Sequence, residues 1–495
     1  MRCMDDTPHP FRPPGMLPAA ALAAFTGRWN TRLAAHLLRR AGFGGSPADV
    51  ARLAQGSMPD AVTSLVAFPS TERLADAPAD LPSDRELALR VMQAKVNATP
   101  GAPDPNVVEM RKQLRMELRR AIMSLQLWWL DRMIATPAPL QEKMTLFWHG
   151  HFTTAAIQKG VSPRATLAQN ALFRSYALGN VRELTQRVAV DPAMLRYLDN
   201  IHNEAAHPNE NFARELMELY TLGIGNYAEA DVREAARAWT GLRIRRATGD
   251  VYLNPRLHDA ESKTFLGRTG DFTGTDIVNI ILEQPAAARF FATKLLTFFV
   301  YADPEPQLVD DVARLLRDHD FELAPVMTAL LSSNVFYSPR AYRALVKSPV
   351  EFVVGSYQLF NVPAAQPLAL DALRRMTQVL FYPPNVKGWP GGSAWLNTST
   401  VLARENFANA LLTANVVDGS NWLLAPGRGS PELAAAAIVA AVAQDDVSAA
   451  SRARLEAYLS GAGSAVLGAL SAENFEQRMR GGAYLTMAMP AYQLA

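Results

Sequence analysis

Apolar residues recur every three or four positions through most of this chain, the spacing that lines one face of an α-helix. The longest such stripe runs over 107–133 and ends before Pro137 and Pro139. Strand-like alternation is confined to 242–245 and 251–253. The sequence therefore predicts an all-α or nearly all-α fold, a large multi-helix domain with few short strands. The same spacing predicts further helices over 33–40, 164–178, 211–222, 231–240, 286–301, 307–318, 322–331, 339–360, 368–380 and 401–416.

Composition divides the chain into three parts. Residues 1–28 contain a crowd of prolines and predict a flexible N-terminal segment. Residues 29–417 predict the main helical domain, with a loop-rich insertion near 75–106 where Pro, Asp and Ala are frequent. A stretch of Gly, Ser, Asn and Pro opens the last part, residues 418–495, which we expect to form an Ala-rich helical C-terminal appendage.

Charge and hydropathy argue against nucleic-acid and membrane partners. The chain has 49 basic and 47 acidic residues, so its net charge of +2 creates no general attraction for nucleic acid or an anionic membrane. No stretch reaches the roughly 18 uninterrupted apolar residues that a membrane span needs. We therefore expect a soluble protein without a membrane span. The only cysteine, Cys3, excludes an internal disulfide and a thiolate metal cage.

The apolar stretch over 17–25 is a poor match to a secretory leader. Prolines interrupt it, and Asp5 and Asp6 dilute the positive charge that precedes it. This favours the cytoplasm over export, although the compartment stays open.

Two of the eight histidines lie in one aromatic hexapeptide, Phe147 to Phe152. Two residues turn a helix by about 200°, so His149 and His151 can converge only if the backbone opens into an extended or turn conformation. With a carboxylate such as Glu215 they would then form an open nitrogen and oxygen site suited to zinc or iron, with a bound water as the reacting group. These three residues are our candidate metal ligands.

A second candidate segment is a predicted helix that begins near Asn209 and ends at Gly223. Glu215 and Glu218 are three residues apart and share one face, and Arg214 lies four residues before Glu218. Two interpretations fit this pattern. The residues form a solvated surface ion pair, or they are acids held beside a cation.

A polar turn at 258–267 is the third candidate. His258, Asp259 and Lys263 lie within six residues of one another. A histidine oriented by a neighbouring carboxylate is the usual way to make a general base or to fix the tautomer of a metal ligand. A plain polar loop with a capping aspartate fits the same residues.

The segment 381–397 is a polar loop rich in Trp, Gly and Pro. Its prolines and glycines prevent a helix. Aromatic faces beside amide donors can hold a sugar ring or another extended polar ligand, so the candidate ligand-binding residues are Asn385, Lys387, Trp389 and Trp395. Alternatively, the Trp rings fold onto the helical core and the loop acts as a plug.

Six segments carry a resemblance when taken together and in order: His36 to Gly44, Phe147 to Phe152, Pro208 to Leu216, His258 with Asp259, Lys347 to Glu351, and Asn385 to Pro390. They resemble the large bacterial family known as domain of unknown function 1800, over about residues 29–409. The resemblance implies a mainly helical fold, frequent export and no settled activity. It also implies a gene that often lies beside one for a sulfatase-like protein, itself of unknown function. This chain departs from the family in lacking a clear leader.

Because the shared segments are polar, we hypothesise that they meet in one cleft. The residues of this hypothesis are His149, His151, Arg214, Glu215, Glu218, His258, Asp259 and Lys263, with the loop as the rim. In a metal-free version, His258 with Asp259 is the base, Glu215 or Glu218 is the acid, and Arg214 or Lys263 holds an anionic substrate group. The reaction would be hydrolysis or lyase chemistry on a saccharide or peptide-like substrate.

The competing hypothesis is a non-enzymatic binding or assembly protein. In it, the Trp-bearing loop grips a polymer or a sulfatase-like partner protein, and the charged residues only knit the fold together. Convergence of the polar side chains on one hollow would favour an enzyme, and scattered side chains would favour binding. The sequence names no cofactor beyond zinc or iron and leaves the oligomeric state open.

Overall fold

The computed structural model of this chain describes residues 21–68, 76–96, 105–245, 248–365, 367–414, 430–461 and 474–495. Across these residues it contains 22 α-helices and two small antiparallel hairpins, so the predicted nearly all-α fold is confirmed. Residues 1–20 of the predicted flexible segment, with Cys3, lie outside the described residues. So do most of residues 97–106 of the predicted insertion and residues 418–429 at the predicted boundary.

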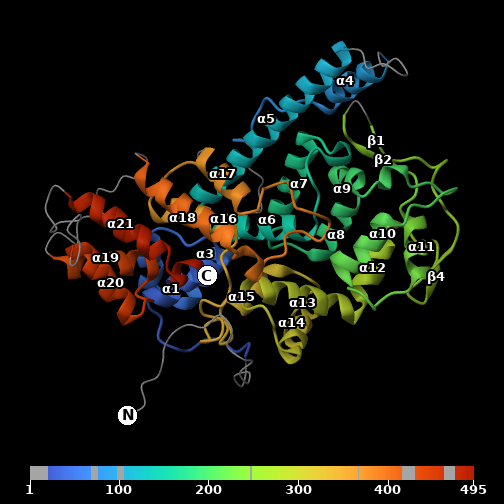
Figure 1. Ribbon diagram of the computed structural model, residues 1–495. Coiled ribbons are helices and arrows are strands. Elements are labelled where there is room, and N and C mark those ends of the chain that lie inside the picture. The colour runs from blue at the N-terminus through green and yellow to red at the C-terminus, as the bar shows by residue number, and fades with distance from the viewer. Residues whose placement is uncertain are drawn as a thin grey trace.

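One hydrophobic core is formed by helices that lie between residues 21 and 341, coloured blue through yellow in Figure 1. These helices are α1 (Thr31–Ala41), α2 (Pro47–Gln55), α3 (Met58–Val66), α6 (Pro139–His151), α7 (Pro163–Ser175), α8 (Val181–Ala189), α9 (Pro192–Tyr197), α10 (Asn211–Glu215), α11 (Glu229–Ala238), α12 (Gly274–Glu283), α13 (Pro285–Phe299), α14 (Pro306–Asp318) and α15 (Leu323–Leu331). Short helices η1 (Gln158–Gly160), η2 (Asn200–His202) and η3 (Leu216–Thr221) connect them.

A second core joins α5 to the C-terminal helices. The hydroxyls of Ser356 and Tyr492 lie 2.8 Å apart inside it, so helices before and after the predicted boundary at 418 pack together. The helices are α5 (Pro105–Ala135), α16 (Pro349–Leu359), α17 (Pro367–Arg375), α18 (Thr398–Thr413), α19 (Pro431–Ala443), α20 (Ala449–Ser460), α21 (Phe475–Met487) and α22 (Pro490–Gln493), with η4 (Gly392–Trp395) before α18.

Helix α6 contributes side chains to both cores and is enclosed on nearly every face. Its charged residues are buried with partners, as the cost of desolvating a charge requires. Glu142 accepts hydrogen bonds from Arg174 at 2.7 and 3.0 Å and from the indole of Trp129 at 3.0 Å. Lys143 forms an ion pair with Glu351. The helix is therefore a fixed central element.

Local capping decides where many helices begin. Ser162, Asp191 and Thr273, for example, each accept a hydrogen bond from a backbone amide of the first turn. The prediction of one helix over 339–360 is wrong in its first part, because α16 begins at Pro349. The capping box of Ser348 with Glu351, followed by proline at the first helical position, fixes that start.

Both hairpins lie in the segment between α11 and α12. Strand β1 (Leu242–Ile244) pairs with β2 (Val251–Leu253), as the alternation predicts. Strand β3 (Lys263–Phe265) pairs with β4 (Arg268–Gly270), and this hairpin is not predicted because its residues are mostly polar.

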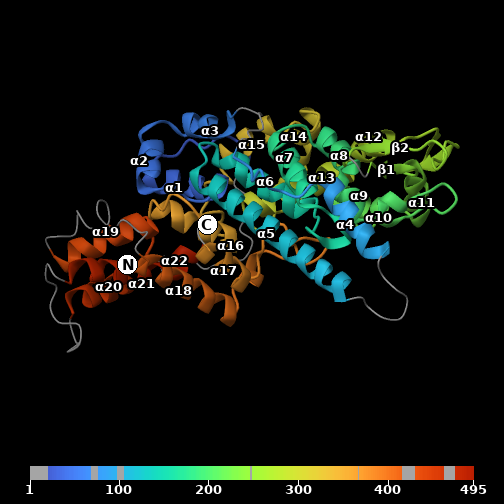
Figure 2. The same cartoon turned by 90° about the horizontal axis from the view of Figure 1, so that it is seen from above.

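A two-helix arm projects from the body. It consists of α4 (Asp84–Val96) and the first half of α5, as Figures 1 and 2 show. An ion pair between Arg90 and Glu117 joins the two helices. Among the described helices, none combines the length and the apolar character that crossing a bilayer requires.

Candidate functional site

The hexapeptide with the two histidines is the end of α6, and the helix continues through His151. The backbone therefore does not open in the way that would let both imidazoles converge, and the two rings lie in different surroundings. Within the described residues, no three histidine, cysteine, aspartate or glutamate side chains form a group that could hold a metal ion. The structure thus does not bring His149, His151 and Glu215 together as a ligand set.

His149 is an internal packing residue, 3% exposed. Its Nε2 accepts a hydrogen bond from the Phe381 amide at 3.2 Å, and its ring lies against Trp129 and Trp389 at centroid distances of 5.4 and 5.5 Å. Burial lowers the pKa of His149 to about 3, because the apolar surroundings disfavour the charged imidazolium. His149 is therefore neutral at physiological pH.

His151 is enclosed by aromatic rings of α6, η3 and α13. Its Nε2 donates to the carbonyl of Tyr220 at 2.9 Å, and its Nδ1 has no hydrogen-bond partner among the described residues. Burial, together with the positive charge of Lys294, lowers the pKa of His151 to about 3.

The predicted helix near Asn209 is formed by α10 and η3, and η3 is a π-helix. The Asn209 side chain accepts from the amide of Asn211 at 3.0 Å, and Gly223 ends the segment with a φ of +80°, so both predicted boundaries are confirmed. Hydrogen bonds span five residues here, as in Leu222 N–H to the Met217 carbonyl at 2.9 Å. Such π-helical turns are frequent at functional sites.

Arg214 is held by two carboxylates. It forms a two-pronged pair with Glu229 at 2.7 and 2.8 Å and a further bond to Glu210 at 3.0 Å. These partners raise the pKa of Arg214 and occupy its donors. Its observed role is to fasten α10 to α11.

Glu215 is the one predicted acid whose carboxyl accepts no hydrogen bond from the described residues, and it is half-buried. Burial and the nearby charge of Glu218 raise the pKa of Glu215, while Arg214 and Lys387 oppose the rise. The phenol of Tyr227 donates to Glu218 at 3.2 Å. Two carboxyls and a lysine from the loop thus share one electrostatic neighbourhood.

The loop 381–397 brings the charge of Lys387 within electrostatic range of Glu215, because the loop packs on the end of α6. The Thr153 hydroxyl donates to the carbonyl of Val386. Gly388 has a φ of +81°, and a side chain there would meet the carbonyl oxygen of Gly150. This close approach carries Lys387 toward Glu215 and Trp389 toward His149.

The tryptophans of this loop pack inward. Trp395 is 4% exposed, and Trp389 is partly buried with an indole N–H that has no acceptor in the described part of the chain. Asn385 and Lys387 remain exposed, and the Asn385 side chain accepts from the amide of Lys387 at 2.9 Å. The rings therefore match the alternative in which the loop plugs the core, and its polar residues face outward.

The residues of the polar turn form a separate network. The carboxylate of Asp259 pairs with Arg237 at 2.7 and 3.2 Å and makes no hydrogen bond to His258. Nδ1 of His258 lies 2.9 Å from the carbonyl of Thr240. Lys263 is buried and donates to the carbonyls of Asp259 and Glu261 at 2.9 and 2.8 Å. These contacts stabilise the turn.

The turn and the acid pair lie at opposite ends of α11. Arg237 pairs with Asp259 of the turn, and Glu229 pairs with Arg214 beside the acids. Arg237 lies eight residues after Glu229, which corresponds to about 12 Å of helix. The structure therefore divides the predicted cleft into three groups. Glu215, Glu218 and Lys387 form one, the turn forms another, and the buried histidines form the third.

Two residues near Glu215 carry no signal in the sequence. Tyr197 ends α9, and the charge of Glu215 contributes to its raised pKa, so the phenol lies near that carboxyl. Tyr227 follows Gly223 and reaches back to Glu218. Neither belongs to a motif, and only the packing of α9 and α10 reveals them.

The fold and these side chains define a mainly helical protein with a carboxyl pair at a π-helical turn beside a Trp-bearing loop. The family model described as "Protein of unknown function (DUF1800)" matches residues 36–494, which is nearly the whole chain. The chain belongs to this family, and the resemblance drawn from its six segments is confirmed. No curated protein and no solved structure matches it.

Proposed function

We propose that this protein is an enzyme that carries out hydrolysis or lyase chemistry on a polar, saccharide or peptide-like substrate, with Glu215 as its acid–base group. One observation supports this most. Glu215 is a half-buried carboxyl with no hydrogen bond from the described residues, and its pKa is raised by burial and by Glu218. Such a carboxyl holds its proton to higher pH than an ordinary surface glutamate, which suits it to act as a general acid and base.

The neighbouring residues have complementary roles in this proposal. Glu218, held by the Tyr227 phenol, is the second carboxylate, and it stabilises positive charge or orients a water. Lys387 is exposed beside Glu215 and holds an oxygen-rich or anionic group of the substrate. Asn385, on the same loop, adds an exposed amide at the rim. His258, Asp259 and Lys263 support the fold nearby and take no chemical step.

The variant Glu215→Gln tests the proposal, because it keeps the side-chain shape and removes the titrating proton. We expect turnover to fall by about 100-fold or more, the usual contribution of a general acid or base. The probes are a panel of neutral and acidic polysaccharides, followed by release of reducing ends, and denatured polypeptides, followed by release of amino groups.

A matched change at an exposed glutamate, Glu183→Gln, should leave turnover unchanged. Full activity in Glu215→Gln would disprove the role of this residue. A wild-type protein that turns over none of these probes would count against the enzyme assignment itself.

A second candidate function is assembly with a partner protein, and the projecting arm favours it. Five of the twelve exposed large apolar residues in the described part of the chain lie on α4 and α5: Leu89, Met92, Val108, Met116 and Met123. Contiguous apolar patches mark interaction sites, and these five residues are the candidates for such a patch on the arm. Helix α5 also contains five basic residues over 111–120 against one acidic residue, Glu117, so the partner surface would be apolar and acidic. The sulfatase-like protein of the family resemblance is the candidate partner.

A further inference from the structure

Six buried cations lie on α1, α6, α18 and the segment just before α16. Each is at most 6% exposed: Arg39, Arg40, Lys143, Arg343, Lys347 and Arg404. In the described residues only two carboxylates form ion pairs with them. Glu351 pairs with Lys143, and Asp446 pairs with Arg343 at 2.7 Å. This region of the interior therefore has more positive than negative charge, which is unusual because buried charges normally have partners.

Three of the four arginines donate to backbone carbonyls, although Arg40 and Arg404 also keep donors without an acceptor among the described residues. Arg40 donates to the carbonyls of Val300 at 2.8 Å and Ala341 at 2.5 Å. Arg404 donates to the Lys347 carbonyl at 2.7 Å, and Arg343 to the Ala443 carbonyl at 2.8 Å. Lys143 is the fourth with a protein partner, through its ion pair. These contacts explain why such residues fold into the core.

Arg39 and Lys347 are the two of the six that combine unused donors with a place on the wall of one cavity. The Lys347 ammonium makes no hydrogen bond within the described part of the chain and lies 3.8 Å from the centroid of the Tyr492 ring. Arg39 donates from Nη1 to the Gln444 side chain at 2.5 Å, but its Nε–H and Nη2–H have no acceptor in hydrogen-bond geometry. Arg343 shares the same Gln444 oxygen at 3.1 Å.

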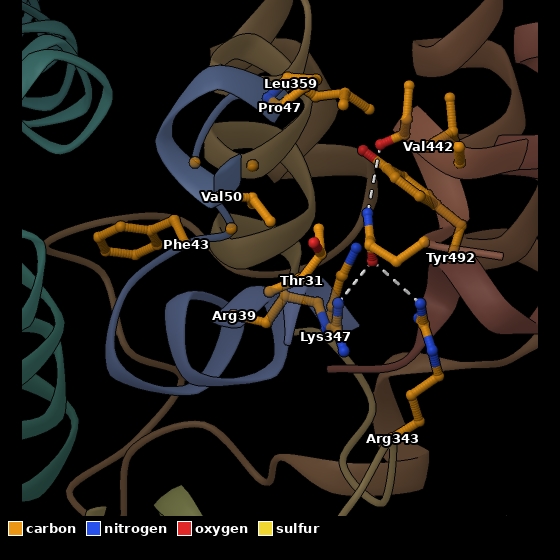
Figure 3. Close-up of a pocket in the computed structure, with 17 residues that line it drawn as sticks. Thr31, Arg39, Phe43, Pro47, Val50, Arg343, Lys347, Leu359, Val442 and Tyr492 are labelled. Carbon is orange, nitrogen blue, oxygen red and sulfur yellow. Dashed lines mark hydrogen bonds between the residues drawn. The ribbon is translucent and has the colours of Figure 1, made fainter. Parts of the chain in front are cut away.

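Arg39, Arg343 and Lys347 converge on one cavity of about 90 Å³ (Figure 3). This is several times the roughly 10–15 Å³ that holds one water. The remaining wall is largely apolar and includes Phe43, Val50, Leu359 and Val442. Exposed Thr31 and Ala440 also line the cavity, so it reaches the surface. Burial and the charges of Arg343 and Arg39 hold the pKa of Lys347 well below its ordinary value, and the charge of Glu351 opposes this only in part.

We propose that this cavity is a binding site for a small organic carboxylate, whose charged end is held by Lys347 and Arg39 and whose short apolar part contacts Val50 and Leu359. A guanidinium and an ammonium with unused donors match the oxygens of a carboxylate. The apolar wall disfavours a fully hydrated inorganic anion. Glu215 does not line this cavity, so the binding proposal can be tested independently of the proposed acid–base function.

Thermal unfolding in the presence of sodium butyrate, sodium acetate and inorganic phosphate tests the proposal on the full chain, with sodium chloride at equal ionic strength as the reference. A ligand that binds only the folded state raises the unfolding temperature. We expect butyrate to raise it most, acetate less and phosphate least. Titration calorimetry with butyrate then gives the affinity.

The variant Lys347→Met removes the charge but keeps the length of the side chain. We expect it to weaken butyrate binding by about tenfold or more, a loss that corresponds to about 1.4 kcal/mol. In the absence of any anion it should raise the unfolding temperature, because it removes an unpaired buried charge beside two arginines. Lys112→Met, the same change on the exposed surface of α5, should alter neither property.

Other results would overturn the proposal. A lower unfolding temperature for Lys347→Met with butyrate binding intact would mean that Lys347 is structural. Binding of phosphate without binding of butyrate would exclude a carboxylate ligand. No response of the wild-type protein to any of the three anions would exclude the site.

Discussion

The imidazoles of His149 and His151 lie among aromatic rings that favour their neutral form. Each ring forms a hydrogen bond through Nε2 with the backbone of a distant segment. His149 accepts from the Phe381 amide, and His151 donates to the Tyr220 carbonyl. The same residue type that suggests chemistry in the sequence therefore serves to join α6 to the loop and to η3. Glu215 shows the opposite case. Its sequence pattern also fits an ordinary surface ion pair, but in the structure its carboxyl is half-buried and its pKa is raised.

The variant His151→Phe tests this interpretation through the pH dependence of stability. The pKa of His151 is about 3 in the folded protein and about 6.5 in the unfolded chain, so its contribution to stability is present above pH 6.5 and is lost as pH falls toward 3. Relative to the wild type, the variant should therefore gain about 2 kcal/mol of unfolding free energy between pH 7 and pH 5. Urea unfolding at the two pH values measures it.

At pH 7 the same variant should change stability by only about 1 kcal/mol, because it loses one hydrogen bond and gains aromatic packing. His319→Phe, at an exposed histidine, is the matched control. Parallel pH profiles for His151→Phe and the wild type would show that His151 is not the buried neutral group described here.

At the scale of elements, the loop 381–397 depends on one close backbone approach. Gly388→Ala would place a methyl group against the Gly150 carbonyl in a left-handed backbone conformation. We expect a loss of about 2–4 kcal/mol in unfolding free energy, from the strained φ and the displaced loop. Urea unfolding and Trp fluorescence, which reports Trp389 against His149, measure both effects.

Gly391→Ala is the matched control on the same loop. Its φ of +70° and ψ of −175° form a conformation that essentially only glycine adopts, but nothing lies within 4 Å of the added methyl group, so only the backbone cost of about 1–3 kcal/mol should appear. Equal effects of the two substitutions would mean that the contact with Gly150 does not hold the loop.

The helices themselves were largely predictable, because a 3.6-residue stripe such as that of α5 is a local property of the sequence. Apolar spacing alone extends the helix too far back, through the turns over 339–348, whereas the local sequence Ser348, Pro349 and Glu351 marks the start of α16. The pairing of Glu215 with Glu218 follows from their spacing. The approach of Lys387 does not, because it depends on a tertiary contact at Gly388.

The same limit explains the polar turn. His258 and Asp259 are neighbours in the sequence, but Arg237 from α11 takes the carboxylate. A charge partner twenty-two residues upstream leaves no local signal. Likewise, Arg39 and Lys347 lie about three hundred residues apart in the sequence, and only the packing of α1 against the segment before α16 brings them to one cavity.

At the scale of the whole molecule, the body is built on two cores that α6 joins, and the arm stands apart from both. This division suggests separate tasks. The body holds the carboxyl pair and the cationic cavity, while the arm carries the exposed apolar and basic residues that we propose for partner binding.

The double variant Leu89→Ser with Met116→Ser tests the arm. If a sulfatase-like partner docks there, co-expressed wild-type proteins should elute together in size-exclusion chromatography, and the double variant should elute alone, because it loses exposed apolar contact area. The matched control is Val401→Ser with Leu402→Ser, two exposed apolar residues of α18. Co-elution that survives the arm substitutions would place the contact elsewhere.

The π-helical segment η3 holds one residue more than an α-helix needs to cover the same rise. Deleting a single residue there would let ordinary i→i+4 winding return over the same rise, so the chain before and after the turn would keep its direction. Only the side chains inside the turn, Glu218 among them, would change direction relative to Glu215. The relative aim of the two carboxyls is thus set by an extra amino acid in the winding of the backbone.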